Sequence, residues 1–149
     1  MHKMSRVVCV LILVLFACAV GCTAPSAEVR QVSLQSISLQ QLDFDLTLDF
    51  FNPNKIAVPV DGIDWGLALF GIDVANGSAN PDEEIPAEGS TEVAVPITVS
   101  LAETADAARH LVSAREIPWN VDGTCRLRVA ANTVEVDFSR AGNWENPLR

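Results

Sequence analysis

Polar and apolar residues alternate strictly across residues 43–50, and this is the clearest pattern in the chain. Successive side chains of a strand point to opposite faces of a sheet, so the apolar residues share one face and the acids and threonine share the other. We therefore predict a half-buried strand that places four large side chains in the core, namely Phe44, Leu46, Leu48 and Phe50.

The tripeptide Asn52-Pro53-Asn54 follows this strand and predicts where it ends. Pro53 has no N–H to donate to a neighbouring strand, and its ring favours an extended conformation at Asn52. Asn54 tolerates a left-handed turn. Strand pairing should therefore stop here.

Six further stretches have the composition of strands, namely residues 29–40, 62–71, 72–78, 91–100, 119–127 and 133–138. In the first, the two-residue period slips between Leu34 and Ile37, as a bulge would cause. Residues 62–71 are apolar on both faces, which predicts a central strand. Pro96 lies on the outward phase of its strand, which predicts an edge position.

Turns and one helix connect these strands. Asn76-Gly77 is expected to form a turn or bulge, and residues 80–89 an acidic, proline-punctuated loop. A helix is predicted at residues 101–114, because Ser100-Leu101-Ala102-Glu103 matches a capping box. Apolar residues then recur at helical spacing, with Leu111 beside the stripe formed by Leu101, Ala105, Ala108 and Val112.

The N-terminus resembles an export signal. Lys3 and Arg6 precede an apolar run at residues 7–20, which is short for a membrane-spanning helix but typical of a signal peptide. Ala19-Val20-Gly21-Cys22 then resembles the processing site of bacterial lipoproteins, although Leu or Val is commoner than Ala19. This resemblance implies that Cys22 becomes the first residue and carries acyl chains such as palmitate. Ordinary signal cleavage near Ala24 is the alternative.

Lipid attachment would determine where the domain works. Two or three acyl chains hold a protein at a membrane essentially permanently. Thr23 stands where Asp would favour retention in the inner membrane, so we expect the bacterial cell envelope, and the outer membrane facing the periplasm if the cell has two membranes. With Cys9 and Cys18 in the signal and Cys22 lipidated, Cys125 remains and no internal disulfide is expected.

These elements predict a mainly β fold, an antiparallel β-sandwich of about seven strands with one helix. It resembles immunoglobulin and fibronectin III domains in architecture only, since the immunoglobulin cysteine pair is missing. We divide the chain into a signal peptide (1–21), a tether (22–28), the sandwich domain (29–140) and a loose C-terminal tail (141–149). Trp144 in the tail either packs against the domain or is exposed.

Charge excludes some partners. The chain has 149 residues and a formal net charge of -9, and losing Lys3 and Arg6 makes it more acidic still. No basic stripe is present to neutralise phosphates, so we expect no nucleic-acid binding. No small-molecule substrate is predicted.

Three groups of residues are candidates for cation binding or catalysis. Asp43, Asp45 and Asp49 lie on one strand face, but alternate residues of a strand are about 7 Å apart, so one strand cannot surround a cation. The acidic loop, with Asp82, Glu83, Glu84 and Glu88, is interpreted as a soluble connection, weak calcium binding being the alternative.

Cys125 and His110 could in principle form a nucleophilic pair. Cys125, however, shares its phase with Trp119, Val121 and Leu127 and should pack as a small apolar residue. His110 lies off the apolar stripe of its helix and should face solvent. We therefore expect no catalytic residue, no metal and no cofactor.

Several segments of the sequence resemble a known protein family. The segments Phe50-Phe51-Asn52-Pro53-Asn54, Trp65-Gly66-Leu67-Ala68-Leu69-Phe70-Gly71 with Ala75 and Gly77, Ile85-Pro86-Ala87 and Val93-Ala94-Val95-Pro96-Ile97 resemble the WHy (water stress and hypersensitive response) domain. This is the module of late embryogenesis abundant (LEA) type 2 proteins. The resemblance covers residues 29–138, with Asn52, Pro53 and Asn54 as its signature and Trp65 where the family often has tyrosine.

The resemblance implies a non-catalytic domain for desiccation and stress responses that protects or binds envelope components. Bacterial members are often predicted lipoproteins, in agreement with Cys22. An envelope scaffold or assembly lipoprotein that binds a protein partner through an edge strand, such as the one with Pro96, is the alternative.

Overall fold

The computed structural model describes residues 23–149 and places β2 (Gln41–Asn52) at the centre of a three-stranded antiparallel sheet. Its neighbours are β1 (Ser26–Ile37) and β6 (Gly89–Ser100). The four predicted core side chains of β2 are each at most 1% exposed, which confirms the first prediction. β6 is the outer strand and Pro96 is exposed, so the predicted edge position is also confirmed.

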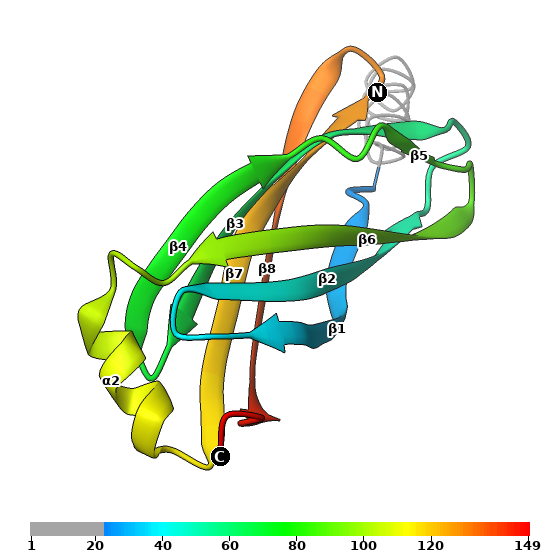
Figure 1. The fold of residues 1–149 in the computed structure, drawn as a ribbon. Helices are drawn as coiled ribbons and strands as arrows, with labels where there is room; N and C mark the ends of the chain where they lie inside the picture. Colours follow the sequence, from blue (N-terminus) through cyan, green and yellow to red (C-terminus); the bar gives the residue numbers. More distant parts are fainter. Residues whose placement is uncertain (1–22) are drawn as a thin grey trace, which may run out of the picture.

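The second sheet has β3 (Val58–Leu69) at its centre, as predicted for this apolar segment. The strand order is β4 (Ile72–Ala79), β3, β7 (Glu116–Val129) and β8 (Asn132–Glu145), while β5 (Glu83–Ile85) pairs with the start of β3. The two sheets pack face to face, and α2 (Ala105–Ser113) covers one end (Figure 1). Residues 23–149 therefore form an antiparallel β-sandwich, which confirms the predicted class with eight strands instead of seven.

Aromatic side chains fill the space between the sheets. Phe44 of β2 meets the edge of Trp65 of β3, with ring centroids 6.3 Å apart. On the other side it lies 6.0 Å from Trp144, which in turn lies 5.5 Å from Trp119. Because large aromatic rings dominate the energetics of small cores, Phe44 is a central packing residue.

Asn76-Gly77 does not form the expected turn or bulge, because both residues pair regularly with Gly66 and Trp65 of β3. The chain reverses at Phe70 and Gly71, both of which have positive φ (54° and 74°). Gly77 lies instead within β4, opposite Trp65. A Cβ there would be 2.6 Å from the indole, so this glycine is needed for close packing and not for a turn.

β1 begins at Ser26, so the predicted tether at 22–28 is too long. Ser26, Ala27 and Glu28 pair with Phe51, Phe50 and Asp49 of β2, and Ala27 is buried. The small and polar residues of this segment do not show a strand pattern by themselves. They form a strand because β2 provides the backbone partners and the apolar side chains beside them. The bulge predicted after Leu34 is confirmed between Leu34 and Ser36, and a second register shift lies between Val29 and Gln31.

The acidic segment at 80–89 is not only a loop. Its residues Glu83, Glu84 and Ile85 form β5, which pairs with Val60, Pro59 and Val58. Ile85 is fully buried. Ile85 is the single apolar residue of this short strand, and its side chain packs into the core beside β3.

The helix starts later than the capping box predicted. Ser100 is still in β6, paired with Gln41, and the Leu101 N–H donates to the Gln40 carbonyl. The helix begins at Ala105 after the N-cap residue Thr104, whose side chain makes no capping hydrogen bond. Ser100 and Leu101 are therefore part of the strand pairing and its end, and they do not cap the helix.

The buried face of α2 also differs from the predicted stripe. Ala107 and Leu111 are buried, whereas Val112 is 59% exposed. Leu101 is buried too, but in the turn before the helix.

β8 extends to Glu145, so the predicted loose tail at 141–149 is wrong for its first five residues. Trp144 is buried, and its indole N–H donates to the Val32 carbonyl of β1 at 3.0 Å. Arg140 donates to the carbonyls of Val29 and Arg30 at 2.9 and 2.6 Å. These contacts join the first strand of one sheet to the last strand of the other, and we call this line the β1–β8 seam.

Candidate functional site

Asn52 of the signature tripeptide forms a buried hydrogen-bond centre at one end of the sandwich. Its side chain is 0% exposed, and its Nδ2 donates to the carbonyls of Ile56, Pro86 and Ile85 at 2.7, 3.2 and 3.4 Å. Its Oδ1 accepts from the Asn54 N–H at 3.0 Å. One amide therefore joins the end of β2 to the next turn and to the segment between β5 and β6.

Asn54 extends this centre to the N-terminal segment. Its Nδ2 donates to the Thr23 carbonyl at 3.0 Å, and its own carbonyl accepts from the Glu88 N–H at 2.9 Å. Asn54 is 8% exposed. We call residues 51–57, with the chain segments that Asn52 and Asn54 hold, the Asn-Pro-Asn corner. Pro53 ends β2 there, as predicted.

A third buried asparagine has a similar role at the opposite end and was missed from the sequence. Asn146 is 5% exposed, and its Nδ2 donates to the carbonyls of Leu111 and Ala114 at 2.8 and 2.7 Å. It thus closes the C-terminal end of α2 against the residue that follows β8. No sequence pattern marks it, because both partners lie more than thirty residues away.

The acidic face of β2 is a hydrogen-bonded outer surface. Asp43 accepts from the hydroxyls of Ser36 and Thr98, both at 2.7 Å, and from Gln41 at 3.0 Å. The three neighbours come from β1, β6 and β2, so this carboxylate links the whole sheet on its outside. The Ser36 hydroxyl, followed by Thr98 and Gln41, holds the pKa of Asp43 below its usual value.

The other acids of β2 have separate partners. Asp45 accepts from Gln35 at 3.0 Å, and Arg30 lies 3.2 Å from both Asp49 and Glu92. These pairs are exposed, so each contributes little to stability. Among residues 23–149 no group of three His, Cys, Asp or Glu side chains is arranged to hold a metal ion, and this includes the acids of β2 and of the acidic loop.

The lowered pKa of Asp43 predicts a pH effect. A carboxylate whose pKa is lower in the folded state stabilises the fold above its unfolded pKa, and this contribution is lost as pH falls through the folded pKa. We expect Asp43→Asn to destabilise the protein at pH 7 and to be equal to wild type in strong acid. Denaturant unfolding of both proteins across pH 2–7 measures this. A difference that stays constant with pH would contradict it.

Cys125 and His110 are not brought together. Cys125 of β7 is 0% exposed and pairs with Ile63 and Val136 in the middle of its sheet. His110 of α2 is exposed and stacks on Phe70, with ring centroids 5.1 Å apart. Both positions agree with the predictions that Cys125 packs as a small apolar residue and that His110 faces solvent.

Burial predicts that the Cys125 thiol is inert. It raises the pKa of Cys125 from 9.0 to about 12, and only the thiolate attacks alkylating reagents. We expect maleimide to label the native protein at pH 8 about a thousand-fold more slowly than a free cysteine, and rapidly in guanidinium. Mass spectrometry of timed samples measures both rates. Rapid native labelling would show that Cys125 is accessible.

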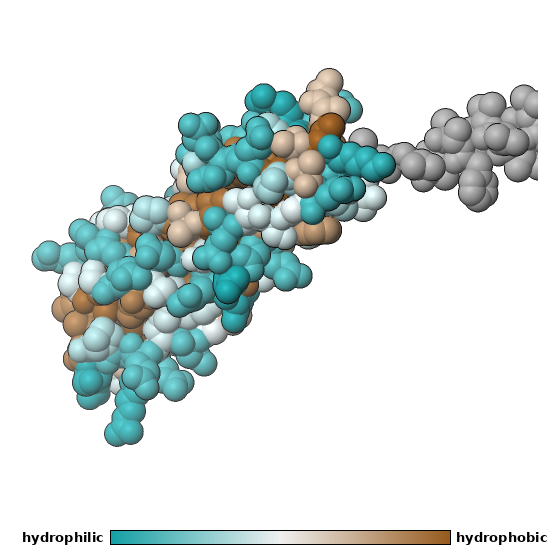
Figure 2. All heavy atoms as spheres, turned by 90° about the vertical axis from the view of Figure 1, so that its right-hand side faces the viewer, coloured by the Kyte–Doolittle hydropathy of each residue, from teal (hydrophilic) through white to brown (hydrophobic). Residues whose placement is uncertain are grey.

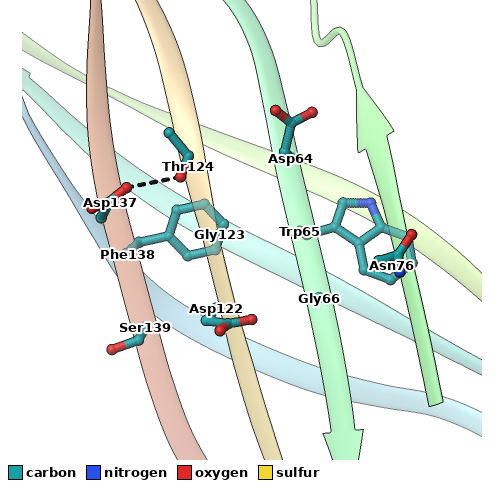
Figure 3. Close-up of a pocket in the computed structure, with 10 residues that line it drawn as sticks. All are labelled: Asp64, Trp65, Gly66, Asn76, Asp122, Gly123, Thr124, Asp137, Phe138 and Ser139. Carbon is teal, nitrogen blue, oxygen red and sulfur yellow. Dashed lines mark hydrogen bonds between the residues drawn. The ribbon is translucent and has the colours of Figure 1, made fainter. Parts of the chain in front are cut away.

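A shallow depression of about 600 Å³ lies on the second sheet and was also missed from the sequence. Figure 3 shows Asp64, Asp122 and Asp137 around it, on β3, β7 and β8. The first accepts from Ser78 at 2.5 Å and from Arg126, and the last accepts from Thr124 at 2.8 Å. The Ser78 hydroxyl contributes most to lowering the pKa of Asp64.

This depression depends on strand register. Asp64, Thr124 and Asp137 are paired across three strands, and so are Gly66, Asp122 and Ser139 in the next outward row. Gly66 leaves the floor open, since a Cβ there would be 2.9 Å from an Asp122 carboxylate oxygen. Two of its three carboxylates already accept internal hydrogen bonds, so the depression is a polar surface without an evident reactive group.

The predicted lipidation residue, Cys22, and the predicted signal peptide at 1–21 lie outside the described residues. Within residues 23–149, no helix is long and apolar enough to cross a membrane.

Several solved structures share this fold. A late embryogenesis abundant (LEA) protein solved in solution aligns with a TM-score of 0.70 at 17% identity, over 98% of this chain and 86% of its own. A protein from Arabidopsis thaliana gives 0.69 at 16% identity, over 84% and 83%. A protein from Archaeoglobus fulgidus gives 0.61 at 12% identity, over 87% and 100%. At these identities the likeness concerns the fold.

The sequence itself identifies the family. No curated protein matches this chain significantly. The family model described as late embryogenesis abundant protein matches residues 47–142, from the middle of β2 to the last residues of β8. This range includes the signature tripeptide and covers well over half of the chain. The chain therefore belongs to the late embryogenesis abundant family of type 2.

Proposed function

We propose that this protein is a bacterial lipoprotein whose LEA type 2 domain protects or binds components of the cell envelope when water is scarce. Family membership is the observation that carries the proposal. The lipid would be attached at Cys22, where the sequence resembles a lipoprotein processing site. In a cell with two membranes, Thr23 favours the outer membrane, with the domain facing the periplasm.

The outer face of the three-stranded sheet supports a role in hydration. Asp43, Asp45 and Asp49 all hold hydrogen bonds from neighbouring strands and still lie at the surface. A fixed array of ionised carboxylates binds water strongly and repels other acidic molecules. Such a surface would keep neighbouring envelope components apart as the solvent is withdrawn.

The role we propose is non-catalytic. Cys125 is buried with a raised pKa, and His110 is exposed on a different element, so this imidazole is not placed to deprotonate the thiol. Two of the three carboxylates of the depression on the second sheet, Asp64 and Asp137, are held by Ser78, Arg126 and Thr124. The protein would act through its surface and its location, without forming covalent bonds to a substrate.

Survival of drying tests the proposal directly. A strain lacking the protein should survive desiccation and osmotic shock less well than its parent, and the wild-type gene should restore survival. The Cys22→Ser variant should fail to restore it and should leave the membrane fraction. Mass spectrometry of the mature N-terminus should show an acylated Cys22. An unmodified N-terminus at Ala24 or beyond would overturn the anchor, and unchanged survival would overturn the protective role.

A second candidate is an envelope scaffold that receives a partner strand at β6. The observation that favours it is the position of β6 at the edge of its sheet, along twelve residues. Pro96 lies in the middle of this edge and removes one donor, so a partner would have to pair on either side of it. Crosslinking in intact cells through a photoreactive residue at Ala94 should then capture one reproducible protein. Failure to capture one would eliminate this candidate.

A further inference from the structure

The Asn-Pro-Asn corner holds the chain directly beside the predicted lipid attachment. Thr23 is the residue after Cys22, and its carbonyl accepts the Asn54 side chain at 3.0 Å. Pro25 is buried, and Ser26 already pairs with Phe51. Neighbouring Cα atoms are about 3.8 Å apart, so the lipid on Cys22 would start within a few ångströms of the folded domain. No flexible spacer separates them.

The same corner exposes large apolar side chains. Phe51 is 47% exposed and Ile56 is 48% exposed, and Ile56 lies two residues from Asn54. Lys55 is also exposed. It lies between Asn54 and Ile56 in the sequence and is the only lysine after residue 22. On the face of the molecule that Figure 2 shows, brown, hydrophobic residues form patches within a largely hydrophilic surface.

We propose that the Asn-Pro-Asn corner rests on the lipid bilayer, with Phe51 and Ile56 entering the boundary between headgroups and acyl chains. This inference deepens the proposed function and rests on lipidation at Cys22. The Lys55 side chain lies along the same surface, with its ammonium group at the level of the lipid phosphates. Long cationic side chains commonly adopt this arrangement at interfaces.

The anchor explains how so small a patch is sufficient. The domain is acidic, and Glu88 is at the same corner, so charge gives little net attraction to an anionic membrane. Attachment of the adjacent residue makes the contact intramolecular, which raises the effective concentration of the patch at the surface. Two apolar side chains are then enough to set the orientation of the domain, although they would not bind a membrane alone.

The opposite end of the sandwich supplies a matched control. Leu39 is 50% exposed, in the turn between β1 and β2. β1 runs from the corner to this turn (Figure 1), and a strand of its length spans roughly 35 Å. Leu39 and Ile56 are therefore alike in size and exposure but should differ in distance from the bilayer.

Fluorescent labels at these two positions test the inference. We would introduce Ile56→Cys or Leu39→Cys into the full-length lipidated protein and label each with an environment-sensitive maleimide. Cys125 is buried and Cys22 would be blocked by its thioether, so the new thiol alone should react. The proteins would be reconstituted in vesicles of phosphatidylethanolamine and phosphatidylglycerol, with and without a nitroxide-labelled lipid.

The expected result is a blue-shifted label at residue 56 that nitroxide lipid quenches several-fold more than the label at residue 39. Equal quenching at both sites, or none, in acylated and vesicle-bound protein would overturn the membrane-resting corner and leave the lipid anchor intact. Absence of acylation at Cys22, detected by mass spectrometry of the same samples, would instead overturn the anchor and the inference together.

Discussion

Replacing Asn52 with alanine is expected to lower the free energy of unfolding by about 4 kcal/mol, because it leaves several buried backbone groups without partners. The carbonyls of Ile56 and Ile85 and the N–H of Asn54 are hydrogen-bonded to this one fully buried amide, whereas the Pro86 carbonyl would keep the Gly89 N–H as a donor. An unsatisfied buried polar group costs more than a hydrogen bond contributes when it is made. Denaturant unfolding followed by far-UV circular dichroism measures the loss.

Two further variants make this result specific. Asn52→Asp keeps the size of the side chain but replaces its amide donors with a carboxylate facing three carbonyls, so it should destabilise at least as much at pH 7. Asn120→Ala removes an exposed asparagine from β7 and should change stability by less than about 0.5 kcal/mol. If Asn52→Ala lowered the free energy of unfolding no more than Asn120→Ala, the Asn52 hydrogen bonds would not be important for stability.

Replacing Phe44 with alanine should cost a similar amount, about 4 kcal/mol, for a different physical reason. Phe44 is 1% exposed and contacts Trp65 of the opposite sheet and Trp144 of β8. Its loss leaves a cavity between the sheets that these large rings cannot fill without moving. Near-UV circular dichroism, which reports the tryptophan environments, should change together with the unfolding midpoint.

Phe51 gives the matched control for this variant. It is on the same strand but at its outward phase and is 47% exposed, so Phe51→Ala should cost well under 1 kcal/mol in solution. The comparison keeps the chemical change constant and varies only burial. Equal losses from the two substitutions would mean that the sandwich core is not organised around Phe44.

Much of the fold could be predicted because alternation along a strand is a local property. The pattern of residues 43–50 identified the four core side chains of β2, and the outward phase of Pro96 identified β6 as an edge. The Asn-Pro-Asn signature was correctly placed at the end of a strand. In each case the information lies within ten residues of sequence.

Three of the incorrect predictions share one cause, which is pairing with another segment of the chain. The capping box at Ser100 was a sound local signal, but Ser100 pairs with Gln41 and the Leu101 N–H donates to Gln40, so the helix starts at Ala105. The first residues of β1 and the last residues of β8 looked like a tether and a tail. Each became a strand because another strand lay beside it.

The candidate site shows the same limit. Asn52 was singled out from the sequence, but its partners at Ile85 and Pro86 lie more than thirty residues away and could not be named. Asn146 was not singled out at all. The depression around Gly66 requires the register of four strands, which no single segment specifies.

The β1–β8 seam makes the last part of the chain essential to the first. Until Arg140 and Trp144 are in place, the carbonyls of Val29, Arg30 and Val32 have no partner on the open edge of β1. In the export that we propose for this protein, the N-terminal segment would cross first and would wait for residues more than a hundred positions later. If the protein folds in the periplasm, as we propose, chaperones there would have to shield the newly translocated chain. A proteolytic cut before Arg140 would leave an incompletely paired, aggregation-prone product instead of a shorter stable domain.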